Sequence, residues 1–153
     1  MIINTRLFGE IDVEDDKMIC FPGGIIGFPE LKDFALIYDE EQGINTIKWL
    51  QSVQEPGFAL PVMDPLYVCP DYNPIVDDEL IRPIGELDTE QMLVLVTVTI
   101  PHEIEKMTVN LRGPIVINAS TRKACQVILE GDSYPVRFPI YEILKANKEK
   151  AGE

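Results

Sequence analysis

The feature that most constrains the fold is an uninterrupted apolar and β-branched run, Met92–Ile100, which contains no glycine, proline or charged residue. An extended chain rises about 3.3 Å per residue, so this run spans about 30 Å, the width of a small domain. Successive side chains point to opposite faces, and one face is wholly aliphatic: Val94, Val96, Val98 and Ile100. The other face carries leucines and threonines and is expected to meet a second layer or partly meet solvent. The run therefore predicts a central β-strand whose valine face lies in a hydrophobic core.

Two further β-rich segments follow, Thr108–Asn118 and Ala124–Leu129, and a short polar connection separates them. Two such runs around a short polar connection predict a β-hairpin. Pro114 has no N–H to donate to a strand ladder, so we expect it at the start of its strand. Near the N-terminus, an acidic turn before Met18 predicts a second hairpin, between the segment that begins at Ile11 and Met18–Phe21.

The rest of the chain alternates short strand-like runs with turn residues, and little of it is helical. Eight or more short strands at short intervals predict an antiparallel sandwich or barrel. Residues 140–150 are expected to form a C-terminal helix with a narrow apolar stripe, Ile140, Ile143 and Leu144. No repeat or linker divides the chain. The predicted organisation is one domain, residues 1–139, followed by a helix and tail at residues 140–153.

The charge of the chain is strongly asymmetric. The formal net charge is −13, and residues 1–100 hold nineteen acidic and only five basic residues. A negative field of this size repels nucleic acid and anionic membranes and attracts basic partners. The alternative is that the acidity only keeps the protein soluble. Direct binding to nucleic acid or to a membrane is therefore not expected.

The cysteines and the apolar runs indicate the cellular compartment in which the protein is expected. The three cysteines, Cys20, Cys69 and Cys125, are widely spaced and form no CxxC pair. This pattern predicts buried thiols in a reducing environment rather than a zinc or redox site. No basic leader precedes a long apolar core, and no run approaches the ~20 apolar residues of a membrane helix. The expected location is the cytoplasm.

The sequence offers no recognisable catalytic constellation. Its single histidine, His102, lies in an expected turn after the central strand, and nothing in the sequence pairs a nucleophile with it. Paired acids such as Asp15 and Asp16 also lie in expected turns, where solvation leaves carboxyl groups without the separated pKa values of acid–base pairs. No calcium-loop pattern is present. We predict no enzyme activity, no metal site and no cofactor.

Four segments, in order along the chain, resemble a known family. The segment Thr108–Leu111 followed by Gly113–Asn118 is similar to the hallmark of the flagellar assembly factor FliW family. Three further segments match the pattern of the same family: Phe21–Phe28, Trp49–Ser52, and Asp64–Pro65 with Pro70–Tyr72 behind it. The resemblance covers about residues 1–139. It implies the barrel-like version of the fold: a mainly β, small antiparallel β-barrel-like domain with short helical turns and a C-terminal helix.

The resemblance also implies a non-catalytic function with two cytoplasmic partners. These are flagellin awaiting export and the RNA-binding translational repressor CsrA, each excluding the other. Free of flagellin, such a protein captures the repressor, so that flagellin synthesis is coupled to export. The acidic charge favours a basic partner independently of the resemblance. The alternative, from another class, is a small barrel that binds or processes a small molecule in its mouth.

Two groups of residues are candidates for partner contacts. The first is acidic and lies on expected turns beside the family-like Pro70–Tyr72 segment: Asp71, Tyr72, Asp77, Asp78 and Glu79. The second is the stripe of the C-terminal helix, Ile140, Ile143 and Leu144, which is narrow for a helix sunk in the main core. An amphipathic helix can lie in a groove of a partner. A terminal helix with no role is the alternative.

Overall fold

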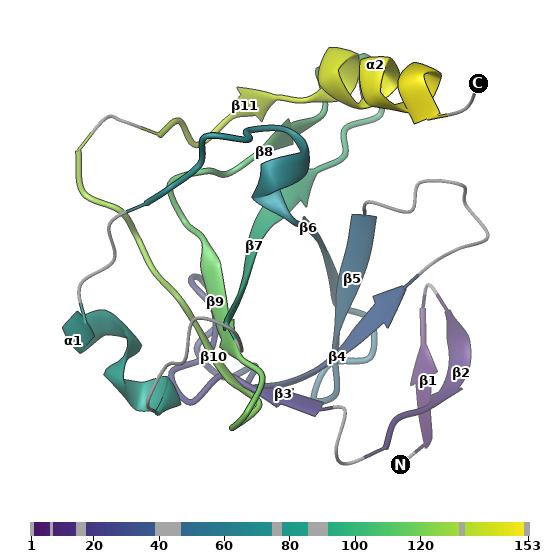
Figure 1. Ribbon diagram of the computed structural model, residues 1–153. Helices are drawn as coiled ribbons and strands as arrows, with labels where there is room; N and C mark the ends of the chain where they lie inside the picture. Colours follow the sequence, from purple (N-terminus) through teal and green to yellow (C-terminus); the bar gives the residue numbers. More distant parts are fainter. Residues whose placement is uncertain are drawn as a thin grey trace.

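The computed structural model describes residues 2–6, 8–14, 18–38, 47–74, 78–85, 92–131 and 134–151 (Figure 1). The strands are β1 (Ile2–Thr5), β2 (Gly9–Asp12), β3 (Met18–Cys20), β4 (Asp33–Tyr38), β5 (Ile47–Ser52), β6 (Ala59–Met63), β7 (Met92–Thr99), β8 (Thr108–Val109), β9 (Ile115–Asn118), β10 (Lys123–Gln126) and β11 (Phe138–Pro139). The helices are α1 (Asp78–Ile81), α2 (Tyr141–Ala151) and the short 3-10 turns η2 (Pro65–Tyr67), η3 (Arg82–Ile84) and η5 (Ile104–Lys106).

The strands form a barrel around the predicted central strand. The main sheet has nine strands in the order β11-β8-β7-β6-β5-β4-β3-β10-β9, and β9 pairs back onto β7. The strands from β7 through β6 to β9 therefore form a closed ring, with β8 and β11 extending beyond it. β7 contacts β6, β8 and β9 through antiparallel pairing. The mainly β, barrel-like fold and the central position of Met92–Thr99 are confirmed.

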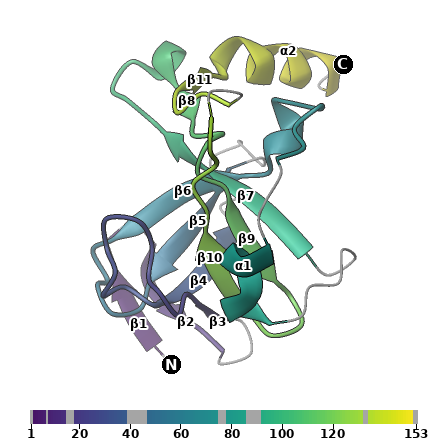
Figure 2. The ribbon, with the colours of Figure 1, turned by 90° about the vertical axis from the view of Figure 1, so that its left-hand side faces the viewer.

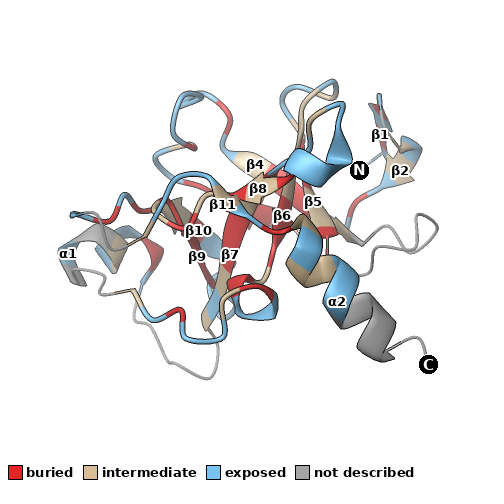
Figure 3. Ribbon diagram, turned by 90° about the horizontal axis from the view of Figure 1, so that it is seen from above, coloured by how far each residue is buried: buried red, intermediate tan, exposed pale blue. Residues whose placement is uncertain are grey.

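β7 separates two hydrophobic clusters. Val96 and Val98 lie in a cluster outside the barrel, and Val96 has 0% of its surface exposed. Leu95, on the opposite face, packs inside the barrel with residues of β3, β4, β5, β9 and β10. Both faces are thus buried at the middle of the strand, as the red strands of Figure 3 show. The predicted core face is correct as far as Val98, but Ile100 is exposed because the strand has already left the core.

The two predicted hairpins have different outcomes. β9 and β10 form the expected antiparallel hairpin, and Pro114 precedes β9 as predicted. The N-terminal hairpin prediction is wrong, because β2 pairs with β1 in a separate two-stranded sheet and β3 pairs with β4. The reason is local: the Thr5 hydroxyl accepts a hydrogen bond from the Phe8 N–H and donates one to the Gly9 carbonyl, both at 2.8 Å. Gly9 adopts a φ of +67°, which suits glycine.

The C-terminal helix packs on the cluster outside the barrel, and α1 lies at the opposite end of the molecule (Figures 1 and 2). Ile140, directly before α2, is fully buried, and its N–H donates to the Met107 carbonyl at 3.1 Å. Ile143 and Leu144 are half-buried against the same cluster. The narrow stripe was expected to lie shallowly, yet its first residue is part of the core. Within the described residues, no helix is long and apolar enough to cross a membrane.

Candidate partner-binding surface

The family-like segment after Thr108 forms a bulge beside β7. β8 pairs with Val98 and Thr99, and β9 pairs with Met92–Leu95, so only two residues of β7 remain between them. The segment that connects β8 to β9 spans the same interval with five residues, Asn110–Pro114. Because the connecting segment is longer than the part of β7 that it faces, it bends away from β7, as in the β-bulges that re-aim side chains next to functional sites. We call Asn110–Pro114 the bulge.

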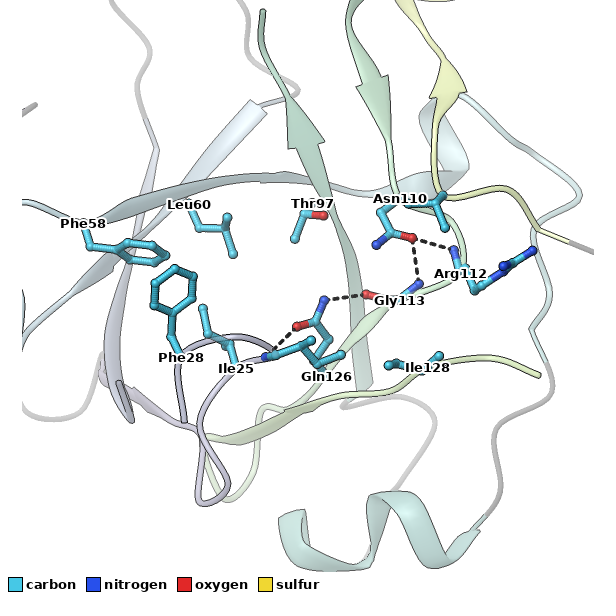
Figure 4. Close-up of a pocket in the computed structure, with 12 residues that line it drawn as sticks. Ile25, Phe28, Phe58, Leu60, Thr97, Asn110, Arg112, Gly113, Gln126 and Ile128 are labelled. Carbon is cyan, nitrogen blue, oxygen red and sulfur yellow. Dashed lines mark hydrogen bonds between the residues drawn. The ribbon is translucent and has the colours of Figure 1, made fainter. Parts of the chain in front are cut away.

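The side chain of Asn110 fixes the shape of the bulge. Its Oδ1 accepts hydrogen bonds from the N–H groups of Arg112 and Gly113, both at 3.0 Å. Nε2 of Gln126 donates to the Gly113 carbonyl at 3.1 Å from the neighbouring strand (Figure 4). A Cβ at position 113 would lie 3.1 Å from Nδ2 of Asn110 and 3.3 Å from Nε2 of Gln126. Glycine is therefore the residue that lets these two amides approach.

Three further carbonyls of the bulge also accept hydrogen bonds. The Tyr72 hydroxyl donates to the Leu111 carbonyl at 2.6 Å. The Leu129 N–H donates to the Arg112 carbonyl at 2.8 Å, and the Val127 N–H donates to the Pro114 carbonyl at 2.9 Å. Hydrogen bonds from two distant segments thus hold the bulge in one conformation, so it can present side chains in a fixed arrangement.

Tyr72 is therefore a structural residue. It is buried, and its ring meets that of Tyr134 edge-on with the ring centroids 4.7 Å apart. Burial raises the pKa of the Tyr72 hydroxyl well above its usual range, and the neighbouring Tyr134 and Cys69 raise it further. The hydroxyl stays protonated and continues to donate to the bulge at every physiological pH.

An apolar pocket opens in front of the bulge (Figure 4). It has a volume of about 320 Å³. Thr97 is paired with Val62, whose side chain lies inside the barrel, so the pocket lies at a mouth of the barrel above its inner cluster. We call it the barrel-mouth pocket, and its lining is Ile25, Ile26, Phe28, Phe58, Leu60, Thr97, Asn110, Arg112, Gly113, Gln126, Ile128 and Val136.

The rim of this pocket gathers exposed apolar side chains. The exposed fractions are 50% for Ile26, 41% for Phe28, 59% for Ile128 and 48% for Val136. Exposed apolar groups that cluster in one place mark sites of protein or ligand contact. Among the described residues, Nδ2 of Asn110 has no hydrogen-bond acceptor, so it can donate to a bound molecule. The pocket therefore suits an apolar group that carries a nearby hydrogen-bond acceptor.

Acid–base and metal chemistry find little support in the described part of the chain. The pocket lining contains no carboxylate and no histidine. No three histidine, cysteine or acidic side chains in the described ranges lie close enough to hold a metal ion. The three cysteines are half-buried thiols, and burial raises the pKa of the Cys125 thiol, which lowers its reactivity.

The structure separates the residues that the sequence nominated for partner contacts. Tyr72 and Ile140 are buried in the cluster outside the barrel, with Ile143 and Leu144 at its edge. Asp71 is exposed, as is Glu79 on α1 at the other end of the molecule (Figure 2). Asp77 and the side chain of Asp78 lie outside the described residues.

None of the nominated residues that the structure describes lines the barrel-mouth pocket, and the sequence analysis did not predict the pocket. A signal was present, since the family-like segments Phe21–Phe28 and Thr108–Asn118 both supply lining residues. In the sequence, the first segment was noted only for its resemblance to the family, and the second was also predicted to be part of a hairpin.

Comparison with known proteins now identifies the family. The sequence profile described as FliW protein matches residues 2–140. The chain belongs to the FliW family. A flagellar assembly factor FliW from Lachnospira eligens is 45% identical over 147 residues, which cover 95% of this chain and 97% of the relative.

Two further FliW proteins extend the comparison. The flagellar assembly factor FliW of Lachnoclostridium phytofermentans is 40% identical over 151 residues, 98% of this chain and 97% of the relative. A crystal structure of the flagellar assembly factor FliW matches this fold with a TM-score of 0.84 at 28% sequence identity, covering 92% of this chain and 97% of the other. The resemblance noted in the sequence is confirmed for nearly the whole chain.

Proposed function

We propose that this FliW family member is a non-catalytic, cytoplasmic flagellar assembly factor with two alternating partners. It binds flagellin before export. When free of flagellin, it binds the translational repressor CsrA and antagonises it, which couples flagellin synthesis to export. The observation that carries the proposal is the barrel-mouth pocket, because family-like segments build it and exposed apolar side chains surround it.

The apolar rim of the pocket favours the interpretation that a protein partner binds there over the interpretation that the rim is a solvated surface with no role. Ile26, Phe28, Ile128 and Val136 come from separate parts of the chain, and the fold gathers them around one opening. Leaving several large apolar side chains in water at one place has a free-energy cost, which a partner can recover by covering them. Flagellin awaiting export would be such a partner.

The acidic body supports capture of a basic repressor. Opposite net charges raise association rates, and salt screens the effect with a Debye length of ~8 Å at physiological ionic strength. Among the proposed contacts, Asp71 and Glu79 are exposed in the structure. Charge reversal at Asp71, Glu79 or the neighbouring Asp77 and Asp78 should slow association with the repressor more than it speeds dissociation. An association rate that does not change with salt would refute the steering.

The C-terminal helix is a proposed second contribution to repressor capture. Ile140 is buried and supports the fold, so only the half-buried Ile143 and Leu144 can contact a partner without disrupting the core. Lys145 is exposed on the same helix and adds positive charge to an acidic protein. Removing residues 145–153 keeps Ile140, Ile143 and Leu144, the residues of the helix segment that pack on the cluster. It therefore tests the helix more cleanly than removal of the whole segment from Ile140.

The decisive experiment mixes the purified protein with flagellin and with the repressor, separately and together, and measures complexes by size-exclusion chromatography and calorimetry. Each partner should bind alone, and flagellin should displace the repressor. Phe28→Ser should weaken binding of at least one partner by about tenfold or more, since it removes an apolar anchor. Ile104→Ser is the matched control, because Ile104 is also an exposed apolar residue but lies on η5 and does not line the pocket. Failure of both partners to bind would overturn the proposal.

A small apolar ligand in the same pocket is the second candidate function. The volume of about 320 Å³ lies at the lower end of the range for ligand pockets. A panel of small apolar compounds, screened by thermal melting, separates the two functions. A ligand that raises the melting temperature, and whose effect is lost in Phe28→Ser, would favour the small-molecule function.

A further inference from the structure

The barrel ring is barely closed between β3 and β10, a junction that we call the open seam. Lys123 and Cys20 form its single registered pair, supported by a hydrogen bond of 2.9 Å from the Cys20 N–H to the Arg122 carbonyl. Beyond that pair, β3 ends and the chain turns away into the glycine-rich loop of residues 22–29, while β10 continues. One edge of the segment after Lys123 therefore has no neighbouring strand.

The hydrogen-bond directions along this segment show which groups are left open. Val127 and Leu129 direct their N–H groups to the Pro114 and Arg112 carbonyls on the bulge side. Backbone groups of successive residues in an extended chain point in opposite directions. Those of Gln126, Ile128 and Glu130 consequently face the open seam. Within the described ranges, the backbone N–H and C=O groups of Ile128 and Glu130 have no hydrogen-bond partner.

Apolar space lies beside this open edge. The barrel-mouth pocket is lined by Gln126 and Ile128, and a second cavity of about 380 Å³ is lined by Ala124, Cys125 and Gln126 together with the loop of residues 22–29. Ile26 borders both cavities. Its N–H binds Oε1 of the Gln126 side chain at 3.1 Å, so the loop is tied to a side chain while the backbone edge stays unoccupied (Figure 4).

We infer that the open edge at residues 126–130 is a strand-addition site for an extended segment of a protein partner. In this mode of recognition, main-chain hydrogen bonds provide affinity and pockets for alternate side chains provide specificity. An added strand would pair with Ile128 and Glu130 and place an apolar side chain in the barrel-mouth pocket. The inference concerns how a segment is held, and it does not depend on which partner supplies it.

The negative charge of the protein limits which partner segments can bind at the open edge. A second copy of this chain would bring another net charge of −13 to the same edge, which opposes self-pairing. Glu130 stands at the end of the edge, exposed. The fitting occupant is an extended segment with apolar residues at alternate positions and a neutral or basic net charge.

The test uses the full chain and a phage-displayed library of random short peptides as the probe. Enriched peptides should alternate apolar and polar residues and carry no net negative charge. With one enriched peptide bound, the amides of Ile128 and Glu130 should become protected from hydrogen exchange in NMR. No enrichment, or protection confined to another part of the surface, would overturn the inference, as would self-association of the chain through this edge.

Two substitutions at Ile128 separate the contribution of its backbone N–H to peptide binding from that of its side chain. Ile128→Ala removes the side chain but keeps the N–H, whereas Ile128→Pro removes both. Proline suits an outward-facing edge position, and the hydrogen bonds of Val127 and Leu129 are retained in each variant. Ile128→Pro should bind the peptide about tenfold more weakly than Ile128→Ala, with both melting as the parent does. Equal affinities in the two folded variants would show that no strand is added.

Discussion

The two junctions that close the barrel differ in how well they are held. β9 joins β7 through four registered pairs, from Met92 with Asn118 to Leu95 with Ile115, and we call this junction the closed seam. The open seam between β10 and β3 has one registered pair. Beside the closed seam lies the bulge, four of whose carbonyls accept hydrogen bonds, and beside the open seam lie an unpaired edge and two cavities.

The difference shows how one small domain separates support from recognition. Buried side chains and completed hydrogen bonds on one side hold the bulge rigid. The same bulge forms a wall of the barrel-mouth pocket, which opens toward the other side. Substitutions of buried residues at the closed seam should therefore cost stability, whereas substitutions of exposed residues at the open seam should cost binding alone.

Val96→Asp should have the largest effect. Val96 is fully buried on β7, next to the closed seam, and a carboxylate there would be stranded without a partner. We expect a loss of about 4 kcal/mol or more in the free energy of unfolding, enough to abolish cooperative folding. Circular dichroism melting checks it, with Leu93→Asp as control, because Leu93 is exposed on the same strand. A soluble Val96→Asp protein that melts cooperatively would place this face outside the core.

Gly113→Ala should have an intermediate effect. The added Cβ would press on the amides of Asn110 and Gln126, which hold the bulge and the pocket wall. We expect a loss of about 1–3 kcal/mol in the free energy of unfolding, measured by urea denaturation. Gly23→Ala is the matched control at the open seam, because a Cβ there meets nothing within 4 Å, and its unfolding should be unchanged. Similar losses in the two variants would remove the distinction between the seams.

Tyr72→Phe should cost about 1–2 kcal/mol in the free energy of unfolding, because the buried Leu111 carbonyl loses its donor. Its dependence on pH is a sharper test. The folded state raises the pKa of Tyr72, so this stabilisation is present below pH ~10 and is lost as pH rises further, since unfolded tyrosine ionises first. The stability difference between parent and Tyr72→Phe should shrink above pH ~10 in urea titrations. A constant difference up to pH ~11 would contradict the buried hydrogen bond.

Ile128→Ser should have the smallest effect on stability. Ile128 is exposed at the open seam, and its loss should change the free energy of unfolding by about 0.5 kcal/mol or less. Binding of flagellin or of the repressor, measured by calorimetry, should nonetheless weaken. A large loss of stability in this variant would mean that the open edge is part of the core.

Local patterns in the sequence predicted the features that depend on local chemistry. The run Met92–Ile100 predicted the central strand, and the position of Pro114 predicted where β9 begins. The N-terminal hairpin was assigned to the wrong pair of strands, because the hydroxyl of Thr5 closes a turn whose hydrogen bonds no periodicity reveals.

The candidate site depended on contacts between distant segments and could not be predicted in the same way. Tyr72 was nominated as a partner contact because it follows Asp71 in a family-like segment. Its hydroxyl instead meets Leu111, 39 residues further along the chain. The barrel-mouth pocket likewise combines Phe28, Leu60 and Ile128, which only the closure of the barrel brings together. The open edge exists because β3 ends at Cys20, before Pro22 and Gly23, whereas the partner segment beside it continues, and no pattern within β10 reveals this.

The most direct test of the difference between the seams is amide hydrogen exchange of the free protein, followed residue by residue by NMR. Val127 and Leu129 donate to the bulge and should exchange slowly, as should the paired amides of β9. Ile128 and Glu130 face the open seam and should exchange rapidly, giving an alternating pattern along a single segment. Uniform protection from Val127 to Glu130 would show that the seam is closed and would contradict the account.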